Sequence, residues 1–367
     1  MNVKNLLQSA AQGRRLSFEE GLLLLKQAPL IDLGWAANEA RRRFHPDSQP
    51  ITFVIDRNVN YTNVCDAYCS FCAFYAPPGS KKGYVLPYET IKAKIDELVS
   101  IGGTQLLLQG GHNPELGIEY YEELLARIRA DFPDLTLHAL SPSEIDHITR
   151  VSGIPLTEAL ERLVAAGLSS IPGGGAEILT DSVKQQISPL KMPAARWLEV
   201  METAQRMGLK TTATMMYGSV ETLEDRLEHL VKVRAVQDRT GGFTAFITWS
   251  FQPGSTPLAR KVKRQTTAVE YLRMVAISRL MLDNIANIQT SWVTQGAGLG
   301  QTAFSFGAND FGGTMLEENV VSAAGTYHQV TMAHMIDCIH AAGRDAAQRD
   351  TQYRILKLYP RPQTKAA

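Results

Sequence analysis

The sequence predicts an α/β fold, a (β/α)8 barrel of the TIM type with helical additions at both ends. Short apolar runs rich in β-branched residues alternate with helical segments from residue 51 to about residue 330. Buried strands joined by helical crossovers are typical of a parallel sheet. About eight such units favour closure into a barrel. We therefore expect an N-terminal helical segment (1–50), a barrel (51–330) and a C-terminal helical segment or tail (331–367).

The elements are expected in the following order. Residues 17–20 read Ser-Phe-Glu-Glu, a capping box that predicts a helix start in the N-terminal segment. Strands are predicted where apolar and β-branched residues gather before glycine, proline or polar residues, at 51–55, 104–109, 135–140, 168–171, 210–216, 243–248, 285–290 and 303–306. Helices are predicted at 86–100 and 119–130, from the residues after Ser141 and Pro142 to about 166, near 182, and at 194–207, 222–239 and 268–282.

An open, doubly wound sheet is the competing architecture. Its phosphate-binding fingerprint, G-x-G-x-x-G after the first strand, does not follow residues 51–55. In a barrel, chemistry lies where the strands end. The cysteine-rich, glycine-rich and polar stretches of this chain follow the predicted strands, so we expect them to meet at one mouth.

Composition excludes several classes of partner. The 37 Lys and Arg residues balance 37 Asp and Glu residues, so neither nucleic acid nor an anionic membrane is expected. The apolar run at 21–25 is too short to span a bilayer, and no leader pattern opens the chain. Only 4 cysteines occur in 367 residues, which disfavours a disulfide framework. Reduced thiols without a leader predict a cytoplasmic protein.

The most specific motif is Cys65, Cys69 and Cys72, a C-x-x-x-C-x-x-C triplet. Thiolates bind soft metals and iron–sulfur clusters. A cubane cluster held by three cysteines keeps one iron without a protein ligand, and that iron can hold a small molecule. The alternative is a structural zinc site, which needs a fourth ligand such as Cys338 or His112.

Other candidates each have a structural alternative. Gly110 and Gly111 allow close approach to a ligand, or form a tight turn. Glu144 follows a predicted strand, but a carboxylate also suits the first turn of a helix. His112 is as compatible with a structural histidine as with a functional one.

The cysteine triplet, with Phe71 before its last member, resembles the radical S-adenosylmethionine (SAM) superfamily. The motifs at 60–63 (Asn-Tyr-Thr-Asn), 171–177 (Ile-Pro-Gly-Gly-Gly-Ala-Glu) and 307–312 (Gly-Ala-Asn-Asp-Phe-Gly) are similar to the menaquinone enzymes of the futalosine route. The nearest likeness is to the cyclic dehypoxanthine futalosine synthases. Aminofutalosine synthase and the deazaflavin (FO) synthase subunits share many of these motifs and remain alternatives. A noncatalytic iron–sulfur or zinc-binding protein is the alternative from another functional class.

The resemblance implies a set of cofactors and partners. Cys65, Cys69 and Cys72 are expected to hold a 4Fe-4S cluster, whose open iron takes SAM. The residues expected around SAM are Gly110, Gly111, Ser141, Glu144 and Glu177. The implied reaction converts dehypoxanthine futalosine to its cyclic product through a 5′-deoxyadenosyl radical. An electron donor such as flavodoxin or ferredoxin is implied as a partner.

The chemistry of that reaction makes three further demands. Removal of the last proton needs a base, for which Asp310, Glu177 and His112 are the candidates. The substrate carboxylate needs a donor, for which the candidates are Gln252, Asn309, Thr248 and backbone amides. A radical site must exclude water, so residues 1–50 and 331–367 are expected to supply lid elements.

Overall fold

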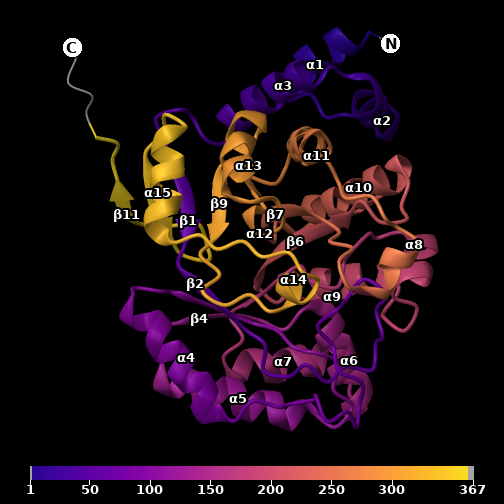
Figure 1. Ribbon diagram of the computed structural model, residues 1–367, viewed down its shortest axis with the longest axis vertical. Helices are drawn as coiled ribbons and strands as arrows, with labels where there is room; N and C mark the ends of the chain where they lie inside the picture. Colours follow the sequence, from indigo (N-terminus) through magenta and orange to yellow (C-terminus); the bar gives the residue numbers. More distant parts are fainter. Residues whose placement is uncertain (1, 363–367) are drawn as a thin grey trace.

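The computed structural model in Figure 1 describes residues 2–362. One 11-stranded sheet forms its centre, in the order β11-β10-β1-β9-β8-β7-β6-β5-β4-β3-β2. β1 (Ile51–Val54) and β2 (Asp56–Val59) are two pieces of one strand separated by a single residue. β1 pairs in parallel with β9, and β2 pairs in parallel with β3. The sheet thus returns to its first strand, which confirms the expected barrel.

Strands and helices alternate along the barrel as the sequence predicts. The further strands are β3 (Gln105–Leu108), β4 (Thr136–Ala139), β5 (Ser170–Ile171), β6 (Lys210–Tyr217), β7 (Phe243–Ser250), β8 (Asn287–Gln289) and β9 (Asp310–Gly313). The outer helices are α4 (Tyr88–Ser100), α5 (Ile118–Asp131), α6 (Pro142–Ser152), α7 (Leu156–Ala166), α8 (Asp181–Ile187), α9 (Ala194–Arg206), α10 (Leu223–Thr240) and α11 (Ala268–Met281). Short helical turns complete the barrel at η1 (Pro257–Arg260), α12 (Trp292–Gln295), α13 (Ala297–Thr302) and η2 (Ala303–Phe306).

The start of several helices is encoded locally. Capping boxes begin α2 (Phe18–Gln27), α6, α10 and α11, with Ser or Thr at the N-cap and Glu or Asp three residues later. In each box, the side chain of the capping residue accepts a backbone N–H while the carboxylate accepts the N–H of the cap. Among residues 2–362, no helix combines the length and apolar character that crossing a bilayer requires.

The N-terminal segment forms α1 (Val3–Ala11), α2 (Phe18–Gln27) and α3 (Leu30–Arg42), which group together at one end of the molecule in Figure 1. These helices pack on the outside of the barrel, against α10 and α11. The guanidinium of Arg234 in α10 donates a 2.9 Å hydrogen bond to the carbonyl of Leu16. This segment therefore supports the outer wall, and the expectation that it supplies a lid is wrong.

The C-terminal segment contains α15 (Met332–Ala341) and two strands that the sequence reading did not anticipate, β10 (Ala346–Arg349) and β11 (Ile355–Tyr359). β10 pairs in parallel with β1, and β11 pairs antiparallel with β10. The turn between them reaches the barrel interior, where the hydroxyl of Thr351 donates to Oε1 of Gln105 at 2.8 Å. The extension thus closes the interior from the side of β1 and β3.

The last barrel strand lies later in the chain than predicted. Residues 303–306, Ala-Phe-Ser-Phe, are mostly apolar, as in a short strand, but they form η2, and the strand is β9 at 310–313. The phenyl ring of Phe306 packs against Gly34 of α3, and that of Phe304 packs against Phe311. The two aromatic side chains therefore serve packing around a short helix. As a consequence, Asp310 begins the last strand instead of following it.

Candidate active site

Two neighbouring cavities lie inside the described fold. The cysteine cavity, about 180 Å³, is lined by Cys65, Cys69 and Cys72 together with loops that follow β3, β4 and β5. The lumen cavity, about 310 Å³, lies inside the barrel and is lined by residues of β2, β3, β4, β6, β7, β8, β9 and β10. Gln109, Gly174, Gly175 and Val320 line both cavities. A group held in the cysteine cavity therefore faces the barrel interior across a shared wall.

The cysteine loop carries its thiols into one enclosed space. All three thiols are free, and those of Cys65 and Cys69 are buried. Tyr68, between them, has a backbone φ of +45°, a conformation that non-glycine residues adopt only when the surrounding structure requires it. Burial raises the pKa of the Cys69 thiol to about 12, so a thiolate there needs a cationic partner such as a metal.

The three thiols fit an open iron–sulfur cluster better than a closed zinc site. A structural zinc ion takes four protein ligands. Cys338, the one other cysteine, packs in the hydrophobic core from α15 and does not line the cysteine cavity. The remaining candidate, His112, lines the cavity, but its ligating atoms group with those of Asp66 and His147, within 4.8 Å of one another, and no such group among the described residues contains a thiol. Three soft donors with an adjoining space suit a cubane cluster with one open iron.

Gly110 and Gly111 let the end of β3 approach the cysteine loop closely. A Cβ at Gly111 would lie 2.1 Å from the carbonyl oxygen of Val64, and one at Gly110 would lie 2.6 Å from the ring of Tyr61. The N–H of Gly111 donates to the carbonyl of Thr62 at 3.0 Å. The pair therefore both packs against the loop and lines the cysteine cavity.

Ser141 and Glu144 form the capping box at the start of α6 and also line the cysteine cavity. The Glu144 carboxylate accepts hydrogen bonds from the Tyr61 hydroxyl (2.9 Å), the Gly110 N–H (2.8 Å) and the Ser141 N–H (2.7 Å). Burial raises the pKa of Glu144 above its usual value. This carboxylate is occupied by protein donors, so it braces the glycine pair and the cysteine loop.

Glu177 lines the lumen cavity at the end of the glycine run that follows β5. Its backbone φ is +42°. Its carboxylate forms ion pairs with Lys191 at 3.0 Å and with Lys184 at 3.3 Å. Burial opposes its charge, but the two ammonium groups outweigh burial and hold the pKa of Glu177 below its usual value. Two lysines around one carboxylate bring a surplus positive charge to the site, and Lys191 lines the cysteine cavity.

His112 is buried in the wall of the cysteine cavity, and its ring lies 4.9 Å from the ring of His147. Its Nδ1 atom has no hydrogen-bond partner among the described residues. Burial, followed by the charge of Lys191, lowers its pKa well below the usual value, so the imidazole is neutral at pH 7. Its carbonyl accepts the N–H of Asp66 at 3.0 Å, which ties it to the cysteine loop.

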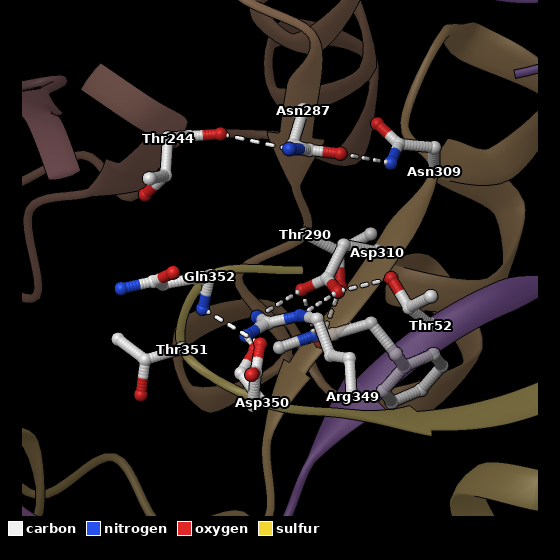
Figure 2. A network of polar contacts seen from close by, with 12 residues as sticks. Thr52, Thr244, Asn287, Thr290, Asn309, Asp310, Arg349, Asp350, Thr351 and Gln352 are labelled. Atoms are coloured by element: carbon white, nitrogen blue, oxygen red, sulfur yellow. Dashed lines mark hydrogen bonds and ion pairs between the residues drawn. The ribbon is translucent and has the colours of Figure 1, made fainter. Parts of the chain in front are cut away.

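Asp310 does not lie at the mouth, contrary to prediction. It is fully buried and forms a bidentate ion pair with Arg349, at 2.6 Å and 2.9 Å. The hydroxyl of Thr52 and the N–H of Gly312 also donate to its carboxylate, at 2.5 Å and 2.9 Å. Figure 2 shows this network around the guanidinium of Arg349. Asp310 lines neither cavity, and its carboxylate is engaged by protein donors.

The three side chains predicted to bind the substrate carboxylate also lie outside the two cavities. Gln252, Asn309 and Thr248 line neither cavity. Asn309 is engaged by Arg279 and Asn287, through bonds of 2.8 Å and 2.9 Å. Arg349 is the one lysine or arginine among the residues that line the lumen cavity. Arg349 lies in β10, a strand that was not predicted from the sequence.

Three residues of the site carried no recognisable sequence signal. Lys191 lies in a connection after α8, Asp56 in the middle of the first barrel strand, and Arg349 at the end of β10. Each is an ordinary residue type in an ordinary context. Only the closed barrel brings Asp56 and Arg349 to one cavity.

Comparison with known proteins agrees with the site. Residues 59–233 match the family model of the radical SAM superfamily, and residues 240–362 match the model described as the CofH/MqnC C-terminal region. The crystal structure of methylornithine synthase superposes with a TM-score of 0.72 at 17% sequence identity, covering 92% of this chain and 96% of that chain. That likeness shows the fold. The chain belongs to the radical SAM superfamily.

Sequence identity narrows the assignment. A cyclic dehypoxanthine futalosine synthase of Halalkalibacterium halodurans is 48% identical over 98% of this chain and 96% of its own length. A 5-amino-6-(D-ribitylamino)uracil–L-tyrosine 4-hydroxyphenyl transferase of Methanosarcina barkeri is 39% identical over 96% of this chain and 93% of its own length. Within the superfamily, the chain belongs to the family of cyclic dehypoxanthine futalosine synthases.

Proposed function

We propose that this protein is a radical SAM enzyme that converts dehypoxanthine futalosine to cyclic dehypoxanthine futalosine in menaquinone biosynthesis. The observation that carries the proposal is the shared wall between a cavity with three free thiols and a barrel lumen. Identity of 48% to a synthase of that name supports the substrate. A 4Fe-4S cluster held by Cys65, Cys69 and Cys72 would supply the electron that splits SAM into methionine and the 5′-deoxyadenosyl radical.

The residues around the cysteine cavity then have distinct tasks. Gly110 and Gly111 provide a bare edge of backbone, and Ser141 and Glu144 hold that edge in position. The surplus positive charge of the Glu177 ion pairs, carried by Lys191, suits the carboxylate of SAM. His112 is neutral and lines the same cavity, so its imidazole is a candidate partner for a polar group of SAM.

The lumen cavity suits the substrate because it combines apolar and polar walls. Trp249 and Trp292 line it from β7 and α12, and Asp56, His138 and Arg349 line it from other strands. Val320 of α14 (Val320–Ala323) borders both cavities, and the loop around it is tied to Gln252 by a 2.8 Å hydrogen bond from Thr326. This loop would exclude water together with the C-terminal extension, which closes the interior beside β1 and β3. Free thiols fit a cytoplasmic enzyme that receives electrons from a flavodoxin or ferredoxin.

The proposal is tested with anaerobically reconstituted protein, dithionite, SAM and dehypoxanthine futalosine, read by mass spectrometry. We expect the cyclic product and 5′-deoxyadenosine in equal amounts. Cys69→Ala should abolish both, whereas Cys338→Ala, which removes a thiol outside the cavity, should keep both. Aminofutalosine synthase chemistry would instead retain the adenosyl group in its product. Wild-type protein that cleaves SAM but leaves dehypoxanthine futalosine unchanged would falsify the proposal.

A further inference from the structure

Two carboxylates are buried in the barrel interior, and their surroundings differ. Asp310 is surrounded by Arg349, Thr52 and the N–H of Gly312, as described above. Asp56 of β2 is 3% exposed and lines the lumen cavity. Its Oδ1 accepts the N–H of Met315 at 2.8 Å, and its Oδ2 accepts Nε2 of Gln105 at 3.2 Å. Each oxygen of a carboxylate accepts two hydrogen bonds, so Asp56 retains acceptor capacity toward the cavity.

The backbone around Asp56 is shaped to receive this carboxylate. Met315, which donates to it, has a φ of +46°, a left-handed conformation that a non-glycine residue rarely adopts. A Cβ at Gly313 would lie 2.2 Å from Oδ1 of Asp56, so the close approach of β9 requires a glycine there. The segment after β9 thus accepts strain in order to hold Asp56 in place.

The side chains around Asp56 orient it without neutralising it. The amide of Gln105 is fixed by Thr351, whose hydroxyl donates to its Oε1 at 2.8 Å. Arg349 is committed to Asp310 through two hydrogen bonds. No lysine or arginine among the described residues forms an ion pair with Asp56 within 4.0 Å. Asn58, on the same face of β2, also lines the cavity, and its buried Oδ1 has no hydrogen-bond partner among the described residues.

We propose that Asp56 is a catalytic residue that accepts the proton lost from the benzoate ring after cyclisation. This inference rests on the proposed function. In the cyclised radical, the ring carbon at the new C–C bond still carries a hydrogen. That C–H bond breaks, its proton forms an O–H bond on Asp56, and its electron pair stays in the ring. The ring then holds one electron too many for an aromatic system, and this electron passes to a one-electron acceptor of the iron–sulfur class.

The electrostatics suit that role. Burial raises the pKa of Asp56 to about 6, partly opposed by the N–H of Met315 and by the charge of Arg349. A base with a pKa near the working pH is effective both in taking up and in releasing a proton. The charged and titratable groups that face it or share its cavity are Arg349, Asp310, His138, Glu177, Glu318 and Tyr353. Asp56 is thus ionised at pH 7 and becomes protonated below about pH 6.

The test uses full-length, reconstituted Asp56→Asn and Asp56→Glu, with Asp131→Asn on the exterior as the control. For Asp56→Asn, we expect cyclic product to fall about 100-fold or more, while 5′-deoxyadenosine falls much less and a substrate-derived radical accumulates in electron paramagnetic resonance. Asp56→Glu should recover part of the product. The wild-type product rate should decrease below about pH 6, and Asp56→Asn should lose that dependence.

The outcomes separate this inference from the proposed function. Equal loss of cyclic product and 5′-deoxyadenosine in Asp56→Asn means that Asp56 only supports the fold, and overturns the inference. An unchanged product ratio together with an unchanged pH profile overturns it as well, while the proposed function stands. If Asp56→Asn does not fold, Asp56→Glu and the wild-type pH profile decide. Wild-type protein without any cyclic product overturns both.

Discussion

The cysteine cavity and the lumen cavity share a wall, but each contains a buried carboxylate that is held in a different way. At the cysteine cavity, the carboxylate of Glu144 accepts hydrogen bonds from three neighbouring donors, Tyr61, Gly110 and Ser141. At the lumen cavity, Asp56 has no ion-pair partner within residues 2–362, and Oδ1 of Asn58 has no hydrogen-bond partner there. The first arrangement forms a rigid frame, which suits a bound cofactor. The second keeps polar groups ready for a ligand, at a cost in stability.

The largest expected effect lies in the ion pair that encloses the lumen cavity. Arg349→Met removes the partner of Asp310 and leaves a buried, uncompensated carboxylate. Such a loss destabilises a protein by about 3–5 kcal/mol. Urea unfolding followed by circular dichroism measures it. The matched control is Arg361→Met, which breaks an exposed pair with Asp345 in the same extension and should cost about 0–1 kcal/mol.

Equal effects of Arg349→Met and Arg361→Met would contradict this reading of the lumen. They would mean that the C-terminal extension does not contribute to the barrel interior. The structure instead predicts a clear difference, because β10 lies directly beside β1 and carries Arg349 inward to Asp310.

The second expected effect is a gain in stability when Asp56 is replaced, whereas replacement of Arg349 should reduce stability. Its pKa is raised from 3.8 to about 6 in the folded protein, so the folded state binds this proton more tightly than the unfolded chain. The free energy of unfolding therefore falls as pH rises from about 4 to about 6, and at pH 7 the penalty is about 3 kcal/mol. Asp56→Asn should remove it, and so should be more stable than wild type at pH 7 by up to that amount.

Unfolding at pH 4 and at pH 7, measured without cofactors, checks this prediction. The advantage of Asp56→Asn should be present at pH 7 and absent at pH 4, where the wild-type carboxyl is largely protonated. A variant that is less stable than wild type at both values would show that Asp56 serves the fold. A stable but inactive variant would match the trade-off between stability and activity that is typical of functional residues.

The barrel and the cysteine cavity could be predicted from the sequence because the patterns that indicate them are local. The cysteine triplet, the pair Gly110 and Gly111, and the box of Ser141 and Glu144 each lie within a few residues of one another and use distinctive residue types. A buried parallel strand leaves an apolar run wherever it occurs. Such patterns can be recognised without knowledge of the tertiary structure.

The polar residues of the lumen cavity could not be predicted, because they come together only when the barrel closes. Asp56 and Gln105 come from neighbouring strands, and Arg349 comes from a strand near the end of the chain. The misplaced strand at 303–306 had a further effect. A strand at 303–306 would end before Asp310 and place it at the mouth of the barrel. The observed strand spans 310–313, so Asp310 lies at its start, inside the barrel.

The smallest effect contrasts two glycines and tests the rigid frame of the cysteine cavity. Gly111→Ala would place a Cβ 2.1 Å from the carbonyl oxygen of Val64, and backbone there must shift. We expect a loss of about 1–3 kcal/mol in stability and less iron bound after reconstitution, because the shift displaces the chain next to Cys65. Gly298→Ala, in α13, meets nothing within 4 Å and should be neutral or stabilising by about 0.5–1 kcal/mol. Iron analysis and thermal unfolding of both variants provide the measurement. Full iron content in Gly111→Ala would show that the cysteine loop tolerates movement, and that the close backbone approach of β3 is not what fixes the three thiols.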